Sequence, residues 1–216
     1  VALEKLNDFR DFAGKKDLMA AVGNAYKAVV GMRKTADQQL ALAMTDRDKK
    51  SFKTWVPTIT GLILKSQDLR IAASNSVETS AEVGQLVMLK NFAWLMSEFA
   101  GRERAVLGGI VAGEKRLTPE KLRLLARFRG NVESAQGTVN GLSASSTIPG
   151  TVKKAVADAK TNFFGSFEKT RKAVYKAGIT SAKYPVTSGE WISWATQGID
   201  SLLAIRAAAS KTWTAQ

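Results

Sequence analysis

The feature that most constrains the fold is a stretch of helical periodicity between residues 86 and 141. Small residues recur in it at steps of three and four, which place them on one helix face because 3.6 residues make a turn. A break near residues 113–118 divides the stretch into two helices. The sequence therefore predicts a helical hairpin at the centre of the fold. Its small residues are Ser97, Gly101, Ala105, Gly108 and Ala112 in the first helix, and Ala126, Gly130, Ser134, Gly137 and Gly141 in the second.

Glycine destabilises a helix by roughly 1 kcal/mol relative to alanine, so repeated glycines on one face indicate a packing role. Two faces of this kind allow helix backbones to approach closely. We expect the two stripes to face each other across the hairpin. The residues assigned to helix packing are Gly101, Ala105, Gly108, Gly130 and Gly137.

Apolar residues repeat at steps of three and four in other parts of the chain as well. The further helices expected on this basis cover residues 18–43, 52–73, 152–174 and 191–213. The polar segment 45–50 is read as a turn, and the Ser-rich segment 143–150 is the best candidate for a linker. Strand-like alternation of useful length is absent from the sequence. The sequence thus predicts an all-α fold with about six helices.

Several helix ends carry local signals. Gly113 is placed to end the first helix of the hairpin. Thr118 and Pro119 supply an N-cap and a first-turn proline for the second helix. Thr187 and Glu190 have the spacing of a capping box before the last helix.

The sequence contains no cysteine and no histidine. Disulfides, thiolate zinc sites and thiol catalysis are therefore excluded, and so are the usual general base and every histidine-containing triad. We find no phosphate-binding loop, no pair of acids with a credible partner and no metal-ligand cluster. We expect no catalytic residue, no metal and no cofactor, which makes an enzyme the least favoured class.

The chain begins at Val1 without a signal-peptide pattern, and no window approaches the roughly 18–20 apolar residues that a membrane span needs. We expect it to be a piece of a longer protein.

The net charge of +13 favours anionic partners, from nitrate to nucleic acid. Residues 102–129 and 151–184 are the most basic regions, but the excess is spread over several helices. A basic nucleic-acid-binding module therefore stays open as the alternative function, with affinity that falls steeply with salt. The lack of a recognised motif counts against it. A structural or oligomeric helical protein is also compatible with the periodicity.

Four arginines flank the small residues of the hairpin. Because the two helices run antiparallel, we expect Arg104 opposite Arg127 and Arg102 opposite Arg129. Guanidinium groups gathered in this way repel one another unless a carboxylate, water or a bound anion compensates, and the arginine fork suits planar anions. The functional interpretation is an anion pocket between the helices.

The competing interpretation is that two of these arginines form ordinary surface pairs. Glu98 precedes Arg102 by four residues, and Glu133 follows Arg129 by four. Such pairs contribute a few tenths of a kcal/mol and need no ligand.

The chain resembles the extracytoplasmic helical sensor domains of bacterial transmembrane receptors over LMSEFAGRERAVLGGIVAGEKRLTPEKLRLLARFRG (95–130). It is most similar to the nitrate/nitrite-sensing (NIT) class and related helical bimodular domains. In that class one helix carries an Arg/Gln-Glu-Arg-Gly motif, and arginines of the bundle bind the anion. Arg102, Glu103 and Arg104 match this motif, whereas Ala105 replaces its glycine. The segment GIDSLLAIRAAAS (198–210) is similar to the final helix of such domains.

The resemblance implies one extracytoplasmic sensor domain over 1–216, built as two stacked four-helix bundles that share long helices. The membrane-distal module would cover about 45–145, and the membrane-proximal module about 1–44 plus 146–216. The parent would be a membrane-anchored histidine kinase of a two-component system or a chemoreceptor. The domain would be periplasmic and homodimeric, would bind a small anion and no nucleic acid, and would pass a helix displacement across the membrane. The ligand contacts implied are Arg102, Arg104, Arg127 and Arg129.

Overall fold

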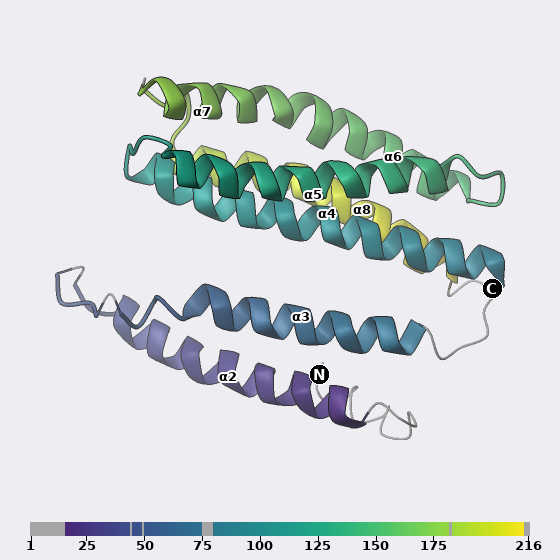
Figure 1. Cartoon of the computed structure of the whole chain (residues 1–216), viewed down its shortest axis with the longest axis horizontal. Coiled ribbons are helices and arrows are strands. Elements are labelled where there is room, and N and C mark those ends of the chain that lie inside the picture. Colours follow the sequence, from purple (N-terminus) through teal and green to yellow (C-terminus); the bar gives the residue numbers. More distant parts are fainter. Residues whose placement is uncertain (1–15, 44, 49, 75–79, 182, 214–216) are drawn as a thin grey trace. The chain divides into compact units, whose positions relative to one another are not determined.

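The computed structural model describes residues 16–213 apart from positions 44, 49, 75–79 and 182 (Figure 1). Within these residues the regular structure is helical throughout. The elements are α2 (Lys16–Leu40), α3 (Trp55–Ser74), α4 (Ala81–Ala112), α5 (Pro119–Ser143), α6 (Gly150–Thr161), the π-helix η1 (Asn162–Phe167), α7 (Glu168–Thr180) and α8 (Ser188–Trp213). Because α6, η1 and α7 follow one another without a break, they form one long helix. The described chain thus has six helices, and the all-α prediction is confirmed.

The chain divides into two compact units, residues 1–78 and 79–216. In the first unit, α2 and α3 pack against each other as a hairpin. The predicted modules, 45–145 and 1–44 plus 146–216, divide the chain at other positions and stay a prediction. The first fifteen residues of the predicted proximal module lie outside the described residues.

The second unit is a four-helix bundle made of α4, α5, the long helix α6–η1–α7, and α8. Successive helices run antiparallel, and α4 packs against both α5 and α8 (Figure 1). Its core contains fully buried side chains from all four helices, including Leu89, Leu125, Phe163 and Trp191. Burying each such side chain contributes about 1.5–3 kcal/mol, which holds the bundle together. A second bundle that shares these helices stays a prediction.

The helix ends of this bundle follow the local signals in the sequence. Thr118 caps α5, because its Oγ1 accepts a hydrogen bond from the Lys121 N–H at 3.3 Å. Thr187 and Glu190 form the predicted capping box: the Thr187 N–H donates to Glu190 Oε2 at 2.8 Å, and the Glu190 N–H donates to Thr187 Oγ1 at 3.2 Å. Gly113 follows the last residue of α4. The predicted ends at these sites are confirmed.

The two small-residue stripes do not face each other between α4 and α5. The five residues of the predicted α5 stripe, Ala126, Gly130, Ser134, Gly137 and Gly141, are all exposed. A Cβ atom added at Gly101, Gly130 or Gly137 would meet no neighbouring atom within 4 Å. The reason is that α5 turns a larger apolar stripe to the core. That stripe consists of Leu125, Phe128, Val132, Ala135 and Val139.

The other two residues assigned to helix packing also differ from the expectation. Ala105 is exposed. Gly108 does lie at a close contact, but with α8 instead of α5: a Cβ at Gly108 would lie 2.9 Å from Ile192 Cδ1. The close approach that Gly108 permits is therefore between α4 and α8.

The π-helix interrupts an otherwise regular helix. Buried positions recur every four residues from Ala155 through Phe163 to Arg171. An α-helix with 3.6 residues per turn would carry such a series gradually off one face. The wider turn of η1 keeps the series on the face that points into the core of the bundle.

None of the helices in the described residues is long and apolar enough to cross a bilayer.

Candidate functional site

Glu103 lies at the centre of a buried polar cluster. It projects from α4 and is 2% exposed. Its Oε1 accepts a hydrogen bond from Arg171 Nε at 2.8 Å and another from the Tyr175 hydroxyl at 2.6 Å. The Arg171 guanidinium also lies over the Tyr175 ring, 4.4 Å from its centroid. Pairing of this kind offsets the large cost of removing two charges from water.

The cluster extends across the bundle as a network of alternating charge. Arg171 Nη1 donates to Glu168 Oε1 at 3.2 Å, and Glu168 Oε2 lies 3.0 Å from Arg129 Nη1. The second contact is an ion pair without hydrogen-bond geometry. Arg129 Nε donates in turn to Glu133 Oε1 at 2.7 Å. This charge network, Glu103–Arg171–Glu168–Arg129–Glu133, connects α4, α7 and α5.

Two groups of the buried cluster, Arg171 and Tyr175, have pKa values that the folded structure raises. Burial lowers the pKa of Arg171, but the carboxylate charges of Glu103 and Glu168 raise it, and the net result is a pKa above its usual value. Burial raises the pKa of Tyr175, and the negative charge of Glu103 raises it further. Arg171 therefore stays cationic and Tyr175 stays neutral.

Two of the four predicted anion-binding arginines are paired with glutamates. Arg129 belongs to the charge network. Arg102 Nε donates to Glu98 Oε1 at 2.8 Å, and its guanidinium lies over the Phe99 ring. The pairs Glu98–Arg102 and Arg129–Glu133, expected from the competing interpretation, are both present.

The other two arginines have no carboxylate within 4.0 Å among the residues that the structure describes. Arg104 is half-buried and reaches α8, where its Nη1 donates to Thr196 Oγ1 at 2.7 Å. The backbone carbonyl of Arg104 accepts a hydrogen bond from the Trp191 indole N–H at 2.9 Å. Arg127 is exposed on α5. The four arginines thus have four different surroundings, and those with uncompensated charge are Arg104 and Arg127.

Sequence reasoning did not single out the partners of Glu103. A signal for its burial is nevertheless present, because Glu103 follows the core residue Ala100 by three positions and precedes the core residue Leu107 by four. Arg171 likewise lies four residues after Phe167 and three before Val174, both buried. The periodicity thus indicates that both charged residues are buried, but it does not identify the partner of either one.

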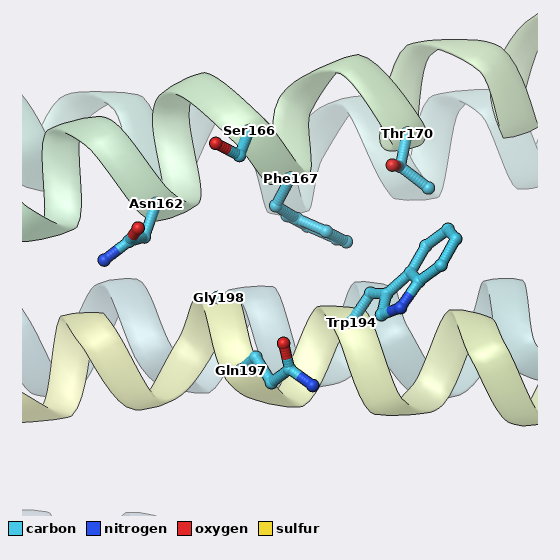
Figure 2. Close-up of a pocket in the computed structure, with 7 residues that line it drawn as sticks. All are labelled: Asn162, Ser166, Phe167, Thr170, Trp194, Gln197 and Gly198. Carbon is cyan, nitrogen blue, oxygen red and sulfur yellow. The ribbon is translucent and has the colours of Figure 1, made fainter.

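A groove of about 460 Å³ lies at the surface between the long helix and α8 (Figure 2). It is lined by Asn162, Ser166, Phe167, Thr170, Trp194, Gln197 and Gly198. None of these residues carries a charge, so the groove is chemically distinct from the charge network. Among the described residues there is no group of three or more His, Cys, Asp or Glu that could hold a metal ion.

Comparison with known families gives a match over nearly the whole chain. A family model described as nitrate and nitrite sensing (NIT) matches residues 2–213. Neither the curated proteins nor the solved structures give a match.

Proposed function

The chain belongs to the nitrate- and nitrite-sensing (NIT) family, and from this premise we propose that it binds a small anion of the nitrate or nitrite type. It is a sensing domain of the kind found in signalling receptors, and it is non-catalytic. The net charge of +13 supports the proposal, because a positive field raises the local concentration of small anions.

The observation that carries the proposal is the surroundings of Arg104. Its guanidinium is half-buried and has no carboxylate within 4.0 Å among the described residues, so its charge is available to a ligand. It contacts one hydroxyl, that of Thr196, through a single nitrogen. The remaining N–H groups of the fork suit a planar anion with two adjacent oxygens.

The other predicted arginines have supporting roles in this proposal. Arg127 is exposed and supplies a weaker, screened attraction. Arg102 and Arg129 are already paired with glutamates, so an anion reaches them only by displacing a carboxylate. We therefore rank Arg104 first, Arg127 second, and Arg102 and Arg129 last.

Ligand binding at Arg104 would act on the contact between α4 and α8. The Arg104 side chain contacts Thr196, and its backbone contacts Trp191, both on α8. An anion that draws the guanidinium away from Thr196 changes the link between the two helices. A helix displacement of about 1–2 Å is a common form of signal transmission in such assemblies.

The proposal extends to the parent protein. The domain would be periplasmic and homodimeric, held by two membrane spans in a histidine kinase or a chemoreceptor. The resemblance of its central hairpin and its final helix to such receptors supports this arrangement.

The test is calorimetric titration of the 216-residue chain with nitrate, nitrite and chloride at constant ionic strength. We expect saturable binding of nitrate or nitrite, and an affinity at least about tenfold lower for Arg104→Ala. Arg123→Ala is the control, because Arg123 is exposed on α5 and its loss changes the net charge by the same amount as the loss of Arg104. Equal binding of chloride, or equal losses in the two variants, would show that the charge of the whole surface attracts the anion and would overturn the proposal.

A further inference from the structure

We propose that the groove between the long helix and α8 is a second ligand site, one that takes an uncharged sugar. Its volume of about 460 Å³ lies in the range of small-molecule sites. The inference is independent of the proposed anion site, because none of the arginines discussed above lines the groove.

The charge of the surroundings limits the chemistry of the ligand. The lining contains no cationic side chain to pair with an anion and no carboxylate to pair with a cation. The net charge of +13 also repels cations from the protein as a whole. A charged ligand would have no partner of opposite charge in this groove, so the lining favours an uncharged ligand.

The hydroxyl and amide groups that the long helix contributes to the lining are unused within the protein, whereas Gln197 of α8 donates to Ser193 Oγ at 3.5 Å. Hydroxyls on helices usually bond to the carbonyl one turn back, as Thr161 and Thr180 do. Among the described residues, the side chains of Asn162, Ser166 and Thr170 make no hydrogen bond of this or any other kind. They present two hydroxyls and one amide, which both donate and accept. A polyhydroxylated molecule matches this set of groups.

Aromatic side chains supply the complementary apolar surface. Phe167 from the π-helix and Trp194 from α8 both project into the space between the two helices (Figure 2). Trp194 is 41% exposed, so part of its ring is open to a ligand. A flat aromatic ring suits the C–H face of a pyranose, and the polar side chains beside it suit the hydroxyl groups at the edge of the sugar.

The π-helix explains why these groups gather here. Asn162, Ser166 and Phe167 all belong to η1, whose wider turn brings residues four and five positions apart onto one face. Gly198 allows α8 to approach that face closely, since a Cβ there would lie 3.1 Å from Phe163 Cδ2. Single π-turns inside α-helices are frequent at functional sites.

The test is a nitrogen–proton correlation NMR titration of the 216-residue chain with methyl α-glucoside and with maltose. We expect saturable shifts of the amides in residues 162–170 and 194–198. Trp194→Ala and the double variant Asn162→Ala with Ser166→Ala should each weaken binding about tenfold. All three side chains are exposed, so these variants retain the fold. Thr180→Ala removes an exposed hydroxyl from the same long helix outside the groove, and should bind like the unaltered chain.

Three results would overturn the inference. The first is the lack of saturable shifts in the groove with either sugar. The second is unchanged sugar affinity in Trp194→Ala. The third is a response of the groove amides to nitrate in place of the sugars, which would assign the groove to an anion. Loss of the sugar response leaves the Arg104 experiment unaffected, so the two proposals fail separately.

Discussion

Glu103 Oε1 and Arg171 Nε meet at 2.8 Å inside the bundle, although 68 positions separate the two residues in the chain. The contact joins α4 to α7, which the chain reaches only after passing through α5 and α6. Both side chains are buried, so neither charge can be satisfied by bulk water if the other is removed. The pair therefore specifies how the long helix is rotated against α4.

Glu103→Ala should destabilise the domain by about 3 kcal/mol, because it leaves a buried guanidinium without its main partner. This loss of stability is at the lower end of the usual range for removing one partner of a buried ion pair, because Glu168 still contacts Arg171. Urea unfolding followed by circular dichroism measures the change. Glu133→Ala is the control: Glu133 ends the same network, but its side chain is 57% exposed, and its loss should cost less than about 1 kcal/mol. Equal losses in the two variants would contradict a special role for the buried pair.

Tyr175 should make the domain sensitive to alkali. Its pKa is raised in the folded state by burial and by Glu103, so the contribution of neutral Tyr175 to stability is fully present below the ordinary tyrosine pKa of about 10. It is lost progressively as the pH rises above that value, because the unfolded chain then releases the proton more readily than the folded one. The free energy of unfolding at about pH 8 and about pH 11 measures this loss.

Tyr175→Phe removes both the hydrogen bond of the hydroxyl to Glu103 and the titration of the phenol, and the two effects are seen at different pH values. At neutral pH the variant should be about 1.5–3 kcal/mol less stable, since a hydrogen bond to the Glu103 carboxylate is lost. Its stability should also fall less between the two pH values than that of the unaltered chain. An identical alkaline loss in both proteins would show that other groups cause it.

Two glycine substitutions should have opposite effects. Gly130→Ala should raise stability by up to about 1 kcal/mol, because the position is helical and exposed and a Cβ there meets no atom within 4 Å. Gly178→Ala should lower stability by about 1–3 kcal/mol, because its Cβ would lie 2.7 Å from both Leu117 Cδ1 and Tyr184 Oη. Thermal unfolding of both variants measures the difference. A destabilising Gly130→Ala would restore the idea that the small-residue stripe of α5 packs closely against another element.

The parts of the fold that depend on local chemistry are predictable from sequence. Thr118 and Thr187 begin their helices through bonds to residues three positions later, so the signal and its effect lie within one turn. The apolar seam of α8 is equally local in origin. The apolar residues that recur at steps of three and four from Trp191 to Ala209 are buried, as the periodicity indicates.

The direction in which a small-residue stripe faces is less predictable, because glycine and alanine are compatible both with a close contact and with solvent. The larger side chains of Leu125, Phe128 and Val132 determine which face of α5 packs against the core. Their burial removes more apolar surface from water than burial of the stripe beginning at Ala126 could. The pairing of Glu103 with Arg171 is beyond sequence reasoning for another reason. The periodicity places each residue in a core, but it does not state which helices will be neighbours.

The π-helix has a consequence for the whole second unit. Each residue of an α-helix advances its side chain by about 100°, so one residue more or less sets the rotational phase of everything that follows. The extra residue in the wider turn of η1 places Arg171 on the side of the helix that faces Glu103, while Val152 and Ala159 of α6 stay in the core. If residues 162–167 followed the regular α-helical turn instead, the same sequence would form an unbroken α-helix. It would turn the α7 end through about a quarter of a revolution, away from its partner on α4.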